Sequence, residues 1–216
     1  MAKWFQLAAP TASHAHARAL ALALALLPAA AGAAPVVCFT PGEDCTGLIV
    51  REIAAARQEI RVQAYSFTSP EIAAALAEAQ GRGVAVRAIL DKSQRTERYS
   101  GADYLAHHGV EVLIDAAHAI AHNKVMVIDG GTVITGSFNF TRAAQERNAE
   151  NLLVLADPEV AARYLANWEA HARHAEPYAA RAGDQPPIRR RGARGSAGAP
   201  STGEVRRFFR ALKSML

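Results

Sequence analysis

Cysteine is scarce in this 216-residue sequence, in which Cys38 and Cys45 are the only two. A scaffold held together by several disulfides is therefore excluded. The two cysteines flank Pro41 and Gly42, so in an oxidising compartment a single disulfide could close a short loop. Two unpaired thiols are the alternative, and a metal site built on these two ligands alone is disfavoured.

Long apolar runs are also rare, and the one that stands out lies near the N-terminus. Basic residues precede this run, which ends in the small residues Ala31-Gly32-Ala33. These features are typical of a secretory signal peptide, so we expect residues 1–33 to direct export to the periplasm or the medium and then to be cleaved. A retained membrane anchor is the alternative, although Pro28 and the Ala/Gly-rich end shorten the span below about 20 strongly apolar residues.

The body of the chain lacks an excess of positive charge. The formal net charge is +4, but residues 181–216 hold nine Lys/Arg against two acidic residues, or +7, which leaves −3 for the rest. The high pI of 9.3 is thus a property of the tail and does not by itself indicate that the body binds nucleic acid.

Residues 179–216 differ in composition from the rest of the chain. They are rich in Gly, Pro, Arg and Ser, a composition that cannot bury enough apolar surface to fold. The last residues, 204–216, could form a short basic amphipathic helix on contact with a membrane or a partner. We therefore expect a basic, disordered tail after a folded domain over residues 34–178.

Half of the residues are hydrophobic, which is ample for a core. Strand-like and helix-like segments alternate through the domain, and this alternation predicts a largely parallel sheet with helices packed on it. The expected strands are 36–40, 60–67, 84–90, 110–114 and 152–156, with two more within 122–140. The expected helices are 47–60, 70–83, one within 91–109, and 159–174, with a helical turn in the polar segment 141–151.

The segment from His122 to Phe140 carries more chemistry than any other. It reads as two strands around a tight turn at Asp129-Gly130-Gly131. If the loop is Asp129-Gly130, His122 lies opposite Ser137, and if it is Gly130-Gly131, His122 lies opposite Asn139.

Either loop gathers an imidazole, an ammonium, a hydroxyl and a carboxamide on one face, from His122, Lys124, Ser137 and Asn139. Burying these groups among apolar neighbours is costly unless they have a partner. An anion such as phosphate would satisfy them.

The pattern His122-x-Lys124, followed by Asp129 and by Gly136-Ser137-x-Asn139, resembles the signature of the phospholipase D superfamily. The resemblance extends from residue 35 to residue 171. It is similar in layout to the small exported bacterial endonucleases of this superfamily, which carry one such motif per chain. The resemblance implies an α/β fold with a mixed β-sheet flanked by helices on both faces.

The resemblance also implies roles for these residues. His122 would be the nucleophile that forms a phosphohistidine, or the acid/base, while Lys124 and Asn139 would hold nonbridging phosphate oxygens. Ser137 would bond the phosphate or the polar network of the site, and Glu150 matches the carboxylate that orients a motif histidine.

Two further motif positions are expected to be structural. Asp129 begins the turn, and the alternation of a regular strand places it off the face of His122 and Lys124. Gly136 belongs to the same motif, directly before Ser137.

Only one such motif exists in the sequence. A reaction that requires two histidines must then take the second from another chain, which predicts a two-fold homodimer with the active site at its interface.

No metal or other cofactor is expected. His118 and His122 could form a metal-binding pair on a helix, but the Val-rich sequence around His122 favours a strand, and no carboxylate or third histidine is suitably placed. The spacing of His171 and His174 predicts a helix surface.

Three functions fit these features. The first is a secreted, non-specific endonuclease on DNA or RNA, with Lys92, Arg95, Arg98 and the tail as phosphate contacts. The second is a phospholipase D that docks on anionic membranes through its C-terminal end. The third is a non-catalytic binding protein for phosphate-bearing ligands.

Overall fold

The structure, a computed structural model, describes residues 33–97 and 100–181, so the expected signal peptide and nearly all of the basic tail lie outside the described residues. The strands are β1 (Val36–Thr40), β2 (Glu59–Ala64), β3 (Ala85–Asp91), β4 (Glu111–Asp115), β5 (Lys124–Ile128), β6 (Thr132–Gly136), β7 (Glu150–Ala156) and β8 (Glu176–Pro177). The helices are α1 (Cys45–Ala55), α2 (Pro70–Gly81), the 3₁₀ turn η1 (Lys92–Arg95), α3 (Ala102–His107), α4 (Arg142–Glu146) and α5 (Pro158–Ala172).

The strands form one eight-stranded sheet in the order β1-β7-β6-β5-β2-β3-β4-β8. The pairs β2–β3 and β3–β4 are parallel, and the other five are antiparallel. The expectation of a mixed α/β sheet is confirmed, whereas that of a largely parallel sheet is wrong. The neighbouring strands β2, β3 and β4 are parallel because α2 and the segment with η1 and α3 return the chain to the same edge between them.

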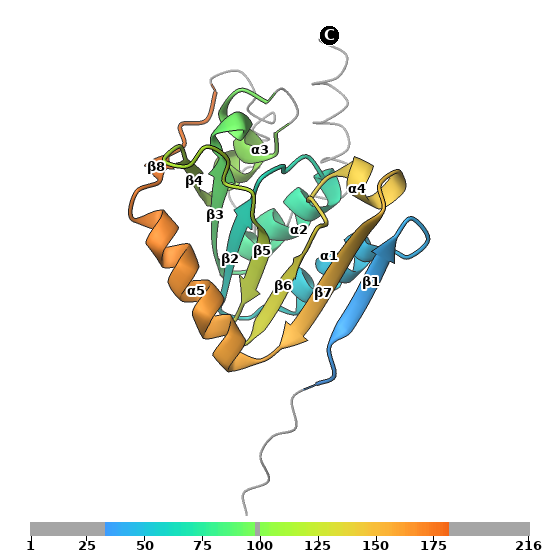
Figure 1. Ribbon diagram of the computed structural model, residues 1–216. Coiled ribbons are helices and arrows are strands. Elements are labelled where there is room, and N and C mark those ends of the chain that lie inside the picture. The colour runs from blue at the N-terminus through green and yellow to red at the C-terminus, as the bar shows by residue number, and fades with distance from the viewer. Residues whose placement is uncertain (1–32, 98–99, 182–216) are drawn as a thin grey trace, which may run out of the picture. The chain divides into compact units, whose positions relative to one another are not determined.

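Helices cover both faces of this sheet (Figure 1). α1 and α2 pack on one face, within the main hydrophobic core. α5 crosses the other face, where the fully buried ring of Trp168 packs with Ile89 and Leu113. In the part of the chain that the structure describes, no helix combines the length and the apolar character needed to cross a bilayer.

The helices begin where side chains can cap them. The hydroxyl of Ser69 accepts from the N–H of Ile72, and Pro70 occupies the first turn of α2. The carboxylate of Asp157 caps α5 in the same way. α1 begins at Cys45, earlier than predicted, and a disulfide between Cys38 and Cys45 ties its first residue to β1.

The turn between β5 and β6 differs from both expected loops. Ile128 pairs with Thr132, so three residues connect the strands rather than two. Asp129 takes a left-handed conformation with φ of 49°, which aspartate tolerates better than most residues. Its carboxylate accepts hydrogen bonds of 2.8–3.0 Å from the backbone N–H groups of residues 57, 58 and 59, where the chain enters β2.

Asp129→Asn is expected to lower the free energy of unfolding by about 1–2 kcal/mol, because the amide keeps only one of the two acceptor oxygens. Although burial acts to raise the pKa of Asp129, the backbone hydrogen bonds outweigh it and lower the pKa. The stabilisation is therefore fully present above the unfolded-state pKa of about 4 and is lost as the pH falls toward the folded-state pKa. Urea unfolding of both proteins between pH 7 and 3 would test this, and a difference that grows on acidification would contradict it.

Candidate active site at the edge of the sheet

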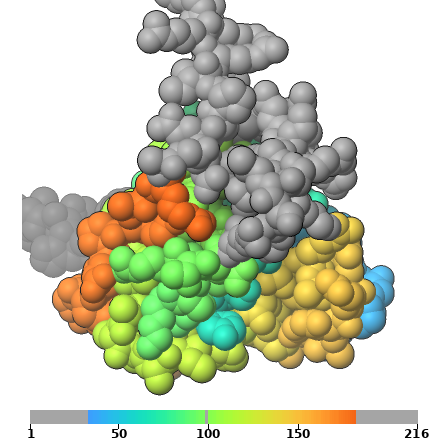
Figure 2. Space-filling view, turned by 90° about the horizontal axis from the view of Figure 1, so that it is seen from above, coloured from blue at the N-terminus to red at the C-terminus, as the bar shows by residue number. Residues whose placement is uncertain are grey.

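One edge of the sheet gathers most of the polar side chains that the sequence singles out. The parallel strands β2, β3 and β4 end at this edge, at Ala64, Asp91 and Asp115, and the antiparallel β5 and β7 begin there, at Lys124 and Glu150. Figure 2 looks onto this edge and shows the yellow segment that contains α4 beside the blue N-terminal part of the described chain. The carboxyl ends of parallel strands are a common place for ligand sites in α/β sheets.

Lys124 is the most buried charged group of the motif, with 7% of its surface exposed. Its ammonium donates a 2.8 Å hydrogen bond to the carbonyl oxygen of His122 and lies 5.0 Å from the ring centre of Tyr65. Burial lowers the pKa of Lys124, and Glu150 acts in the opposite direction. Within residues 33–97 and 100–181, Lys124 forms no ion pair within 4 Å. A buried cation thus lacks an anionic partner.

His122 lies just before β5, not within it as expected. Pairing with β2 continues only to Asn123, whose carbonyl accepts from the N–H of Tyr65 at 2.8 Å. The exposed ring of His122 lies 4.7 Å from the ring of Tyr65, measured between centroids. Among the described residues, this ring has no hydrogen-bond partner, so a nitrogen is available to a substrate.

The side chains of Ser137 and Glu150 are hydrogen-bonded to each other. The Ser137 hydroxyl donates to Glu150 Oε2 at 2.6 Å and accepts from the backbone N–H of Asn151 at 3.1 Å. Asn148 donates to the other carboxylate oxygen at 2.8 Å. Within the single chain, Glu150 therefore braces the polar network and does not bond the ring of His122.

A β-bulge at the end of β6 sets which side chains face the site. The N–H groups of Ser137 and Phe138 both donate to the carbonyl of Asn151. Two residues after β6 therefore lie opposite a single residue of β7, which defines the bulge. Gly136 has a φ of 145°, and a β-carbon there would collide with that same carbonyl oxygen. Both predicted registers are wrong, because a three-residue turn and a bulge replace the regular two-residue hairpin.

Asn139 follows the bulge and is half-buried. Its side-chain oxygen is buried and has no hydrogen-bond partner among the described residues. No hydrogen bond joins the Asn139 side chain to another described residue, so its NH2 group remains able to donate to a phosphate oxygen, the role implied by the motif.

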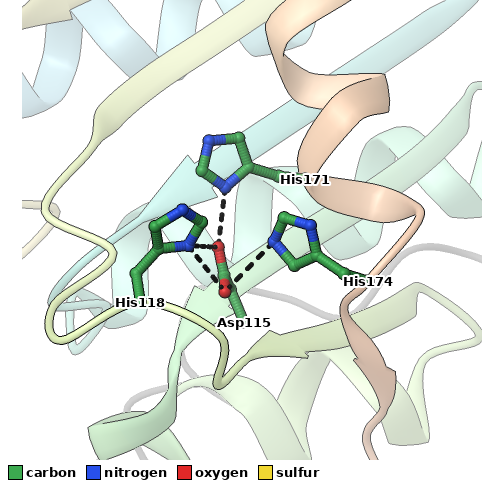
Figure 3. Close-up of side chains that lie close together, drawn as sticks. All are labelled: Asp115, His118, His171 and His174. Carbon is green, nitrogen blue, oxygen red and sulfur yellow. Dashed lines mark hydrogen bonds and ion pairs between the residues drawn. The ribbon is translucent and has the colours of Figure 1, made fainter.

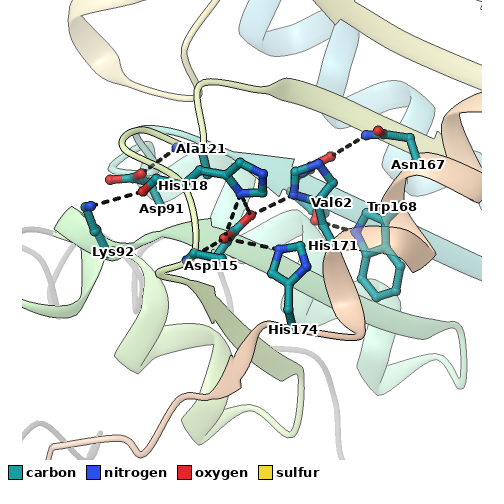
Figure 4. Close-up of polar contacts among 12 residues, drawn as sticks. Val62, Asp91, Lys92, Asp115, His118, Ala121, Asn167, Trp168, His171 and His174 are labelled. Carbon is teal, nitrogen blue, oxygen red and sulfur yellow. Dashed lines mark hydrogen bonds and ion pairs between the residues drawn. The ribbon is translucent and has the colours of Figure 1, made fainter.

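Sequence analysis missed two residues that position this site. Tyr65 contacts both His122 and Lys124, and only its place at the end of a predicted strand hinted at this. Asp91 accepts from the backbone N–H of Ala121 at 2.7 Å, which fixes the chain directly before His122. In Figure 4 the bond from Ala121 to Asp91 is drawn at the left of the cluster.

The basic residues expected to contact substrate are largely engaged elsewhere. Lys92 donates to the carbonyl of His118 at 3.0 Å, and Arg95 pairs with Glu176 at 2.7 Å. Arg98 and the Arg-rich tail beyond Arg181 lie outside the described residues.

A second cluster was not anticipated. The premise that no carboxylate or third histidine lies near His118 is wrong, because Asp115, His171 and His174 surround it (Figure 3). Burial acts to raise the pKa of Asp115, but hydrogen bonds from the three histidines outweigh it and hold the pKa below its usual value. The sequence carried a signal in two pairs with the same spacing, Asp115-x-x-His118 and His171-x-x-His174.

Comparison with known proteins agrees with the motif and the fold. A family model described as "Cardiolipin synthase, PLD-like domain" matches residues 49–172, more than half of the chain. The chain belongs to the phospholipase D superfamily. The matched residues include His122, Lys124, Ser137, Asn139 and Glu150.

Members of this superfamily with known sequences or structures are similar over the same region. A protein of Rickettsia bellii named phospholipase D is 49% identical over 131 residues, which are 61% of this chain and 65% of the relative. A canine mitochondrial cardiolipin hydrolase is 32% identical over 133 residues, 61% of this chain and 52% of the relative. The chain thus spans less than two thirds of the length of these relatives.

Among solved structures, the phospholipase D family member Nuc of Salmonella typhimurium aligns with a TM-score of 0.65 and 36% identity. The alignment covers 67% of this chain and 97% of Nuc. NucT of Helicobacter pylori aligns with a TM-score of 0.63 and 25% identity, over 67% of this chain and 99% of NucT. The described body therefore has the size and fold of Nuc.

Proposed function

We propose that this protein is a phosphodiesterase that hydrolyses the backbone of DNA or RNA without a metal ion in the reaction. The observation that carries the proposal is the buried ammonium of Lys124, which forms no ion pair with any described residue and donates to the backbone carbonyl of His122. The ring of His122 also has no hydrogen-bond partner among these residues, and both side chains contact the ring of Tyr65. A phosphate diester would neutralise the ammonium, and its phosphorus would lie within reach of the imidazole.

The chemistry proceeds in two displacements. A neutral nitrogen of His122 attacks phosphorus, the bond from phosphorus to the leaving oxygen breaks, and a nitrogen–phosphorus bond forms. A second, protonated histidine gives its proton to the leaving alkoxide. The same histidine, now neutral, takes a proton from water, which attacks phosphorus, breaks the nitrogen–phosphorus bond and releases the phosphate monoester.

The second histidine is proposed to be the His122 of another copy of the chain. One chain carries a single motif, and the His122 ring lies exposed at the sheet edge, where a two-fold axis could bring two such rings to one phosphate. We infer a homodimer with one shared active site.

Nucleic acid is the favoured substrate class because the surroundings of His122 offer little apolar surface. Among the described residues, the large apolar side chains that are exposed are three on β1 and Ile120. A single isoleucine near His122 does not form a surface on which acyl chains could lie. The polar edge suits a phosphodiester backbone in water.

A phospholipase D acting on phosphatidyl lipids is the second candidate, favoured by the names of the Rickettsia and mitochondrial relatives. Both candidates use the same site, so the choice rests on what binds around it. A binding protein without turnover is a third candidate, and it would leave the ring of His122 without a chemical role.

The test compares substrates directly. The protein, treated with EDTA and assayed at 25 °C, is incubated with plasmid DNA, single-stranded RNA and phosphatidylcholine vesicles. We expect cleavage of the nucleic acids, little release of choline, and no dependence of the chemistry on added metal. Choline release without cleavage of nucleic acid would establish the second candidate, and saturable binding without any product would establish the third.

A further inference from the structure

Four potential metal ligands converge at a point that the proposed reaction does not use. The carboxylate of Asp115 is fully buried, and the rings of His118, His171 and His174 point at it (Figure 3). The distances to its oxygens are 3.0 and 3.1 Å from His118 Nδ1, 2.7 Å from His171 Nδ1 and 3.4 Å from His174 Nε2. All four ligand atoms lie within 4.8 Å of one another.

These residues come from two distant parts of the chain. Asp115 ends β4, and His118 lies in the loop that leads to β5. His171 lies in the last turn of α5, and His174 follows that helix. The cluster therefore joins the end of α5 to the segment that carries His122.

The spacing of the ligand atoms is compatible with metal coordination. In a tetrahedral zinc site with bonds of about 2.0–2.1 Å, neighbouring ligand atoms are about 3.3 Å apart. The three carboxylate-to-histidine distances bracket this value, and 3.4 Å for His174 is long for an N–H···O hydrogen bond. Without a cation, three ring N–H groups point toward one carboxylate and toward each other.

The rings themselves are crowded. Their centroids are 4.8, 5.2 and 5.4 Å apart, in the three pairings of His118, His171 and His174. N–H groups that point toward each other repel. A cation between the ring nitrogens would remove this repulsion, because each imidazole would then direct a lone pair at the ion. The side chains of His118 and His174 are 47% and 37% exposed, so an ion can enter from solvent.

Supporting contacts hold the ligands in place. The N–H of Ala117 donates to Asp115 at 3.1 Å, and the backbone of His118 is held by Lys92. Close to His171, the indole N–H of Trp168 donates to the carbonyl of Val62 at 2.8 Å, which fixes α5 on the sheet (Figure 4). Outer contacts of this kind orient ligands in metal sites.

The donor set indicates which ion is bound. Three imidazole nitrogens and one carboxylate oxygen suit zinc and neighbouring transition metals, whereas magnesium and calcium prefer oxygen ligands. Four protein ligands complete a tetrahedron, which is typical of a structural site and not of a catalytic one.

We propose that Asp115, His118, His171 and His174 bind a zinc ion that fastens the C-terminal end of α5 to the loop preceding His122. The ion takes no part in the displacement at phosphorus. It stabilises the loop from one side, while Asp91 holds Ala121 from the other. This site is separate from the proposed catalytic group, and its existence does not depend on which phosphodiester is cleaved.

The first experiment measures zinc binding to the full chain. After removal of metals with EDTA, zinc alone is added in competition with a chromophoric chelator, and bound metal is counted by mass spectrometry. We expect one zinc per chain with a Kd below about 1 μM. His174→Gln and His171→Gln should each weaken binding at least about tenfold, whereas His122→Ala should leave the Kd unchanged.

Two readouts separate this proposal from adventitious binding and from misfolding. Cobalt(II) in place of zinc should give the intense visible bands of a tetrahedral site in the wild type and not in His174→Gln. Zinc at 100 times its Kd should raise the Tm of the wild type and not that of the His171→Gln/His174→Gln double variant. Circular dichroism of the metal-free proteins checks that the variants fold.

Each outcome decides whether the four residues bind zinc, whatever the catalytic activity of the protein. Binding of less than about 0.1 zinc per chain, or an unchanged Kd in both histidine variants, would overturn the proposal. Loss of binding in His122→Ala would overturn it too, since the ion would then belong to the catalytic group. A chain that binds zinc as expected but hydrolyses no phosphodiester would contradict only the proposed function.

Discussion

Replacing His122 with alanine is expected to lower kcat for phosphodiester hydrolysis by at least about 10⁴-fold. The change removes the attacking nitrogen and, in the proposed dimer, the proton donor as well. Because the ring of His122 is exposed and has no hydrogen-bond partner among the described residues, the Tm should change little. The measurement is steady-state hydrolysis of the favoured substrate, with His107→Gln, at the end of α3 and outside the motif, as a control. Activity within about tenfold of the wild type would remove His122 from the reaction.

Mixing the same variant with the wild type tests the shared active site. If each site needs His122 from both chains, a threefold excess of the variant lowers the activity per wild-type chain to about one quarter, because wild-type chains then mostly pair with variant chains. If each chain works alone, mixing has no effect. Exchange of subunits must be shown first, by size-exclusion chromatography of differently tagged chains.

Replacing Lys124 with methionine is expected to lower kcat/KM by about 10³-fold while leaving the fold as stable or more stable. The ammonium is proposed to hold the phosphate as charge builds up in the transition state, and the loss of one such contact typically costs about 10²–10³ in rate. Methionine has a similar shape and carries no charge that must be desolvated. We therefore expect the free energy of unfolding to rise by about 0–1 kcal/mol.

The two effects are measured separately, by substrate hydrolysis and by urea unfolding. Arg51→Met, on the exposed surface of α1, removes a cation away from the site and serves as the matched control. A parallel loss of activity and stability in Lys124→Met would mean that the lysine is structural. Full activity would show that phosphate does not bind at this ammonium.

The strands of the hairpin over residues 122–140 could be predicted from the sequence, but their register could not. The apolar, β-branched run after Lys124 predicted β5, and Asp129 with the two glycines marked the turn before β6. The register could not be predicted, because it depends on the three-residue loop held by Asp129 and on the bulge at Gly136. Both features are stabilised by contacts with residues outside the hairpin, the turn by residues 57–59 and the bulge by Asn151.

The histidine cluster shows where that reasoning fails. Each half, Asp115 with His118 and His171 with His174, is visible in the sequence as a pair of ligands three residues apart. A pair of this kind is common on the surface of proteins and predicts little by itself. Only the packing of α5 across the sheet brings the two pairs together.

The sequence by itself determined the α/β class, the limits of most strands and helices, and the set of residues proposed to bind phosphate. These follow from local patterns, since apolar periodicity, capping residues and motif spacing each act over a few positions. The tertiary structure alone decided the strand order, the burial of Lys124, the contacts of Tyr65 and the assembly of the four-ligand cluster. Those features depend on long-range packing, in which residues more than 50 positions apart share one environment, as His171 and Asp115 do at a separation of 56.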